Sequence, residues 1–186
     1  MLTLRQLVRL RRACGQGIDA EPDVAAALER RANRVWRAAL DLPPEPDAPA
    51  NDSRPLALPR ARWSFDRLAR ALGLRLVEES LPGLIVGAFV RAQEIVLVEE
   101  SLAPEERTPV VSHECSHAGL HERASHEEVS YLALALIFPT MLADEHPEGR
   151  AITAFSLRQL VPYGTPQWAA EYRAPILEAF RRSGGW

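Results

Sequence analysis

The chain has 186 residues, of which 47% are hydrophobic, so a domain with a buried core can form. The charged fraction is 25% and the formal net charge is -3, which argues against a protein that coats nucleic acid, because such proteins are basic. No apolar run reaches the roughly 18 residues that a membrane span needs. The two cysteines, Cys14 and Cys115, and the lack of an apolar signal segment between Met1 and Leu10 predict a cytoplasmic protein without a disulfide framework.

The first 40 residues are expected to form one or two helices. Apolar side chains recur at helical spacing over residues 4–11 and again over 25–40, with Gly15 and Gly17 between the two stretches. Six prolines then fall between residues 41 and 61, which predicts an extended linker with little helix or sheet.

The segment after the linker is expected to begin with a helix and to continue as strands. Ser64 is suited to cap a helix that runs through Leu72, and Gly73 is suited to end it. Runs rich in Val, Ile and Phe predict strands over 74–77, 84–91 and 94–98, the last two joined by a tight turn at Ala92-Gln93.

Two helices are expected to follow these strands. Thr108 as N-cap and Pro109 in the first helical position predict a helix that runs to about Leu120. Ser125 and Glu128 have the spacing of a capping box, so the next helix is expected to begin there.

The C-terminal region is expected to be helical in short pieces. The helix that begins at Ser125 should end or kink at Pro139, and a further helical stretch is expected near Met141. Between residues 152 and 180 we expect two or three short helices, broken at 162–164 and at Pro175.

The tail also has a weak helix-turn-helix pattern, in which Trp168, Tyr172 and Arg173 would contact a partner. Basic residues are few there, so packing of short helices on the central domain is the favoured interpretation, and direct nucleic-acid binding is not expected. The chain is accordingly divided into an N-terminal helical segment (1–40), a Pro-rich linker (41–61), a central α+β domain (62–147) and a C-terminal helical subdomain (148–186).

The pattern with the clearest chemistry is His113-Glu114-Cys115-Ser116-His117. Two histidines four residues apart on a helix lie on one face, one turn apart, so both imidazoles can reach a single zinc ion. Glu114 is expected near the rim of the same face, where it can take a proton from a metal-activated water without binding the metal. Cys115 should point away from the histidines as a buried structural thiol. The sequence therefore predicts a zinc site with a general base, and Mn²⁺ is the alternative metal.

A catalytic zinc site needs a third protein ligand and an open coordination position. Glu127 and Glu128 open the helix that follows the motif, and either carboxylate could complete a His-His-Glu site. Glu128 could instead be the capping partner of Ser125, and Glu127 a favourable charge in the first helical turn, and periodicity does not rank the two. The other downstream candidates are His121, Asp144, Glu145, His126 and His146. His121 would either extend the motif helix along the same face or end it near the site, whereas a surface position is the favoured interpretation of His126 and His146.

The stretch from Leu102 to Pro139 resembles the ImmA/IrrE family of bacterial and phage metallopeptidases. That family has an HExxHxxLH-like segment, followed by a helix of the form E-A-[N/D]-x-F-A-x-x-L-L-M-P. The chain has HECSHAGLH at 113–121 and EVSYLALALIFP at 128–139, with Glu128 at the family's ligand position. The resemblance covers about residues 63–140.

The resemblance implies an α+β, zincin-like minimal metallopeptidase fold for residues 62–147, with a small antiparallel or mixed sheet packed on the HExxH helix and additional N- and C-terminal helices. It implies that His113, His117 and Glu128 bind the metal and that Glu114 is the general base. It also implies a protein substrate, because the family cleaves or inactivates transcriptional repressors in stress-response and mobile-element switches.

Two further elements would complete a peptidase site. One strand of the 84–98 hairpin is expected to hold the substrate as an added strand at its edge. The candidate donors to a tetrahedral intermediate are Tyr131, Tyr163, Tyr172 and His126. The rival hypotheses are a non-catalytic, metal-sensing protein of the same fold that binds a partner, and a DNA-associated regulator that uses the tail. The sequence predicts no oligomeric state.

Overall fold

The computed structural model of the protein describes residues 2–3, 21–42, 64–147, 149–161 and 164–184. The helix expected over 4–11, Cys14, the Pro-rich linker up to residue 61 and Tyr163 lie outside these residues.

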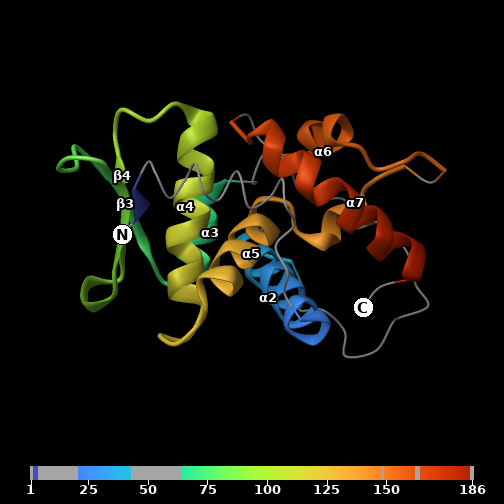
Figure 1. The fold of residues 1–186 in the computed structure, drawn as a ribbon, viewed down its shortest axis with the longest axis horizontal. Coiled ribbons are helices and arrows are strands. Elements are labelled where there is room, and N and C mark those ends of the chain that lie inside the picture. Colours follow the sequence, from blue (N-terminus) through green and yellow to red (C-terminus); the bar gives the residue numbers. More distant parts are fainter. Residues whose placement is uncertain (1, 4–20, 43–63, 148, 162–163, 185–186) are drawn as a thin grey trace.

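A mixed sheet lies at one end of the molecule (Figure 1). Its strands in the described residues are, in spatial order, β1 (Leu2–Thr3), β3 (Ile85–Val90), β4 (Ile95–Glu99) and β2 (Arg75–Glu79). β3 pairs antiparallel with both β1 and β4, whereas β2 runs parallel to β4. The three predicted strands are confirmed, with bounds shifted by one or two residues.

The short elements around the sheet also follow the sequence. α3 (Phe65–Ala71) precedes the sheet, and the Ser64 hydroxyl caps it by accepting a hydrogen bond from the Asp66 amide at 3.2 Å. β3 and β4 are joined by the 3-10 turn η2 (Arg91–Gln93), which confirms the tight turn expected at Ala92-Gln93.

The motif helix, α4 (Pro104–Gly119), begins five residues earlier than predicted. The predicted start at Thr108 is wrong because the preceding turn is itself well suited to helix. Pro104 occupies the first helical position, and the N-cap amide donates to the Glu106 carboxylate at 3.3 Å. Pro109 therefore lies inside the helix, where it does not prevent α4 from continuing through the motif.

The next helix, α5 (His126–Ile137), begins where the capping box predicts, with Ser125 as its N-cap, and it ends before Pro139. α5 packs against α4 on one side and against α2 (Pro22–Ala39) on another. The predicted further helical stretch is the short 3-10 helix η3 (Thr140–Ala143).

The C-terminal region contains α6 (Ala154–Leu160) and α7 (Gln167–Ser183). The predicted break at Pro175 is wrong, because α7 continues through this residue. Pro175 lies on the exposed side of α7, whereas Ala174 and Leu177 are buried against the core. Because proline has no backbone N–H, one carbonyl of the preceding turn loses its helical partner, and on the exposed side water can donate to it instead.

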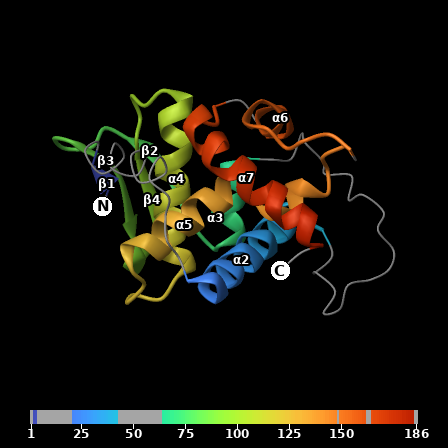
Figure 2. The ribbon, with the colours of Figure 1, turned by 45° about the vertical axis from the view of Figure 1, so that its right-hand side comes forward.

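Among the described residues, a shared hydrophobic core joins these helices to the sheet. It includes Trp36 of α2, Val96 of β4, Leu157 of α6 and Leu177 of α7, all of which are fully buried. Figures 1 and 2 show α4 between the sheet and the remaining helices, so the motif helix is covered on both sides. The fold is therefore α+β with a small mixed sheet, and none of the described helices combines the length and apolar character of a membrane span.

Candidate metal centre

The two motif histidines lie side by side on the C-terminal half of α4. Their Nε2 atoms are 3.2 Å apart, and their ring centroids are separated by 4.9 Å. Two ligand nitrogens on one tetrahedral zinc ion, each at about 2.0–2.1 Å from the metal, are about 3.3 Å apart. The spacing of His113 and His117 therefore fits a shared metal ion, and it follows from their separation of one helical turn.

Burial keeps both imidazoles in the form that binds metal. His113 is 3% exposed, and its removal from water, together with the charge of the neighbouring His117, lowers its pKa to about 3. His117 is half-buried, and burial lowers its pKa as well. Since a neutral ring nitrogen is the metal ligand, protons compete weakly for these two sites near neutral pH.

The sequence alone predicted that Glu114 lies near the rim of the histidine-bearing face. In the structure it lies under the sheet instead. It is fully buried, and its neighbour across the packing interface is Gly87 of β3. A Cβ built on Gly87 would lie 3.3 Å from the Glu114 Cγ and 2.5 Å from the Val110 Cγ1. The absence of a side chain at Gly87 thus allows β3 to approach the carboxylate-bearing face of α4.

Gly87 is a site-shaping residue that the sequence analysis missed. It stands inside a run of strand-forming residues, and an isolated glycine in such a run is a signal of close backbone approach. That signal was available in the sequence, but it could not identify α4 as the element that approaches.

The N-terminal turn of α5 reaches the same region. The His126 ring centroid lies 5.7 Å from that of His113, with the ring planes inclined by 60°. Glu128 instead completes the capping box: its carboxylate accepts from the Ser125 amide at 2.6 Å, and its own amide donates to the Ser125 hydroxyl at 3.1 Å. Glu127 is exposed.

No three His, Cys, Asp or Glu side chains within the described part of the chain already have their donor atoms arranged around one metal position. The two-histidine pair is thus the part of the predicted site that the fold assembles, and the third ligand would have to come from a side chain that turns toward it.

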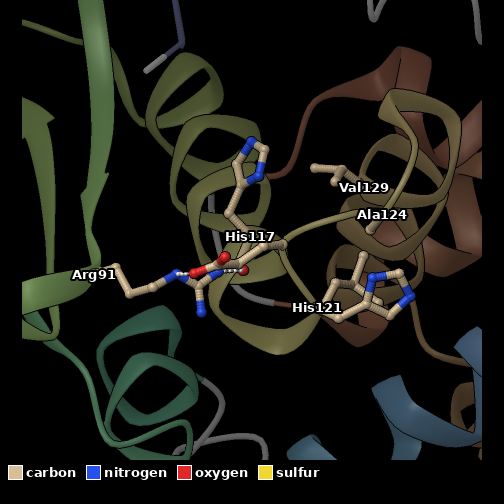
Figure 3. Close-up of a pocket in the computed structure, with 7 residues that line it drawn as sticks. Arg91, His117, His121, Ala124 and Val129 are labelled. Carbon is tan, nitrogen blue, oxygen red and sulfur yellow. Dashed lines mark hydrogen bonds and ion pairs between the residues drawn. The ribbon is translucent and has the colours of Figure 1, made fainter.

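The remaining ligand candidates lie elsewhere. α4 ends at Gly119, close to the predicted end at Leu120, so His121 follows the end of the helix rather than extending it, and Figure 3 shows the His121 and His117 rings pointing in different directions. The extended backbone of Leu120, with ψ at 163°, turns the chain away from the helix axis. Asp144, Glu145 and His146 follow η3, which packs against α2 and α7.

A pocket of about 290 Å³ opens beside His117 (Figure 3). Arg91 stands on one wall, where it donates to the His117 carbonyl at 3.3 Å and forms an ion pair with Glu122 at 3.4 Å. The remaining lining residues are Leu120, His121, Ala124 and Val129. A side chain of a bound peptide could occupy this space next to the two histidines.

Two of the tyrosines expected as donors, Tyr131 and Tyr172, make other contacts in the structure. The Tyr131 hydroxyl donates to the buried Glu29 carboxylate at 2.9 Å, and burial raises the pKa of Tyr131. Tyr172 packs half-buried against the core. Cys115 is fully buried, as predicted, and burial raises its pKa to about 12, so it is an inert thiol.

The suggested role of Arg173 as a partner-binding residue is wrong. Its guanidinium is fully buried and forms two hydrogen bonds with Glu29, at 2.5 and 2.8 Å, and a third with the Phe138 carbonyl at 3.0 Å. Trp168 and Tyr172 are packed against the core. These three residues therefore attach α7 to the rest of the domain through packing and buried hydrogen bonds.

The edge of β3 that was expected to hold a substrate strand carries residues of the chain itself. Leu2 pairs with Gly87, and Thr3 pairs with Ile85, in the antiparallel direction. The edge of β3 beside Glu114 is therefore occupied by β1, and a bound peptide could pair there as an added strand only by displacing β1.

Comparison of the sequence with models of known protein families gives no match, and comparison with curated proteins gives none either.

Proposed function

We propose that the protein is a zinc-dependent endopeptidase with a zincin-like fold, in which His113 and His117 bind the metal and Glu114 is the general base. The observation that carries this proposal is the 3.2 Å approach of the two Nε2 atoms on α4, with the Glu114 carboxylate on the same helix beneath β3. The resemblance of residues 102–139 to the ImmA/IrrE family supports the same assignment.

The chemistry divides between the metal and the protein. A bound zinc ion would polarise the scissile carbonyl and lower the pKa of a water at the site, and Mn²⁺ is the alternative metal. Glu114 would take the proton of the attacking water and deliver it to the leaving amine. Its burial under β3 keeps bulk water away from the carboxylate, so that the proton passes between the reacting groups.

The substrate would bind as an extended strand. It would pair with β3 beside Gly87 in place of β1, and the pocket next to His117 offers room for one side chain. A protein substrate is therefore favoured, and a transcriptional repressor is the class that the family resemblance implies. The third ligand would come from the first turn of α5, where the resemblance gives Glu128 and where His126 faces His113.

The Glu114→Gln variant tests the catalytic role. Glutamine keeps the size of the side chain but cannot accept a proton, so we expect cleavage to fall by at least about 100-fold, while zinc binding stays close to that of the wild type. Cleavage is measured by mass spectrometry on a proteome-derived peptide library, and zinc content by elemental analysis.

The same experiment separates the peptidase from a metal-sensing binding module. Zinc-dependent cleavage by the wild type that disappears in Glu114→Gln supports the peptidase. Cleavage that persists unchanged in the variant, or a zinc-loaded wild type that cuts no peptide in the library, would contradict it.

A further inference from the structure

We propose that β1 is an intramolecular competitor of peptide ligands at the candidate site. Leu2 and Thr3 occupy the edge of β3 beside Glu114, so a substrate strand binds there only after β1 has left. This inference rests on the proposed function, and it adds a regulatory role for β1 at the same site.

The position of β1 carries the inference. Leu2 pairs with Gly87 in the antiparallel direction, and a Cβ at Gly87 would lie 3.5 Å from the Glu114 Oε1, so this strand pair lies beside the buried carboxylate. β1 also lies close to α4, the helix that carries the two histidines. A sheet edge presents one row of backbone N–H and C=O groups, and two extended segments cannot use the same groups at once. Binding of β1 and binding of a substrate strand therefore exclude each other.

The pairing of β1 is short enough to be displaced. β3 spans six residues, whereas β1 spans two and pairs, among the described residues, with Ile85 and Gly87. The register between Leu2 and Thr3 is also irregular. A longer extended peptide could pair with more of β3 than β1 does, and each additional backbone hydrogen bond favours the exchange.

An intramolecular competitor acts on apparent affinity. A peptide binds only the fraction of molecules in which β1 has left β3, so its apparent dissociation constant rises by the inverse of that fraction. A few backbone hydrogen bonds of ordinary strength favour the paired form by about 10-fold or more. Loss of β1 pairing should therefore strengthen peptide binding by about this factor and leave the chemical step unchanged.

The Leu2→Pro/Thr3→Pro double variant tests this effect, because proline cannot donate a hydrogen bond to β3. On a peptide that the wild type cleaves in the library screen, its KM should fall about 10-fold at an unchanged kcat. The matched control, Leu2→Ala/Thr3→Ala, keeps both backbone N–H groups and should keep the wild-type KM. Circular dichroism checks that each variant is folded.

Binding of a separate strand gives a measurement that does not need cleavage. The probe is a synthetic peptide with the sequence of residues 1–8, added to full-length chains that carry Glu114→Gln. It should bind the chain with the two prolines at least about 10-fold more tightly than the chain with the native β1. NMR titration measures the affinity, and slower hydrogen exchange at the β3 amides locates the bound peptide.

The outcomes are distinct. A lower KM in the proline variant, together with tighter binding of the probe, supports the inference. An unchanged or higher KM, or a probe that binds both chains equally or binds neither, overturns it and leaves the peptidase proposal standing. A wild type that cleaves no peptide contradicts the peptidase, and the probe measurement then decides the inference by itself.

Discussion

At Gly87 the sheet comes so close to the motif helix that a side chain has no room. A Cβ at this position would lie 2.5 Å from the Val110 Cγ1, a distance at which the two elements must move apart. We expect Gly87→Ala to destabilise the protein by about 1–3 kcal/mol, the usual cost of an added group in a packed interior. Equilibrium unfolding in denaturant measures the change.

A double-mutant cycle identifies the cause. Val110→Ala alone opens a small cavity, but in the Gly87→Ala background it makes room for the new methyl group. The double variant should therefore be more stable than the sum of the two single changes predicts. Strictly additive effects would show that the contact between β3 and α4 is not what Gly87 provides.

The cap of α5 connects the stability of a single element with the metal site. The Ser125 hydroxyl accepts from the Glu128 amide, and Ser125→Ala removes this bond, which should cost about 1 kcal/mol of stability. Because the proposed third ligand comes from the same turn, fraying of the cap should also weaken zinc binding. Thermal unfolding and zinc titration, run on the same samples, measure the two effects.

Thr153→Ala is the matched control for this element. Thr153 caps α6 by accepting from the Ser156 amide at 3.1 Å, and α6 packs against α7 rather than beside the histidines. Its loss should lower stability by a similar amount, about 1 kcal/mol, with zinc affinity unchanged. Equal loss of zinc affinity in both variants would mean that the coupling is a general effect of lower stability.

At the scale of the whole molecule, a buried ion pair joins α2 to α7. Glu29 of α2 and Arg173 of α7 are both fully buried, and Tyr131 of α5 donates to the same carboxylate. Arg173→Met would leave the Glu29 charge without its partner, so we expect a loss of about 3–5 kcal/mol. Urea unfolding measures it.

Removal of both charges gives the control for this pair. Glu29→Gln keeps an acceptor for the Tyr131 hydroxyl, and in combination with Arg173→Met it eliminates the buried charge. The double variant should recover a substantial part of the stability lost by Arg173→Met alone. No recovery would assign the loss to the packing of the arginine side chain rather than to the unpaired carboxylate.

Several features of the fold and the candidate site could be predicted from the sequence because they depend on neighbours within one or two turns. The strands over 75–79, 85–90 and 95–99 follow from their β-branched and aromatic residues. The start of α5 follows from the capping box at Ser125, and the approach of His113 and His117 follows from helical geometry alone.

Other features were decided by contacts between residues that are far apart in the chain. From the sequence, Arg173 was considered an accessible residue of a tail helix. Its partner in the structure, Glu29, lies 144 positions away, and no local sequence pattern predicts that pairing. The same holds for the placement of Gly87 over Glu114. The sequence by itself determined the helical face that presents two imidazoles. Only the tertiary structure decided that the neighbouring Glu114 lies beneath β3 and that the ring of His126 lies near that of His113, because packing between separate elements selects among side chains that periodicity leaves equivalent.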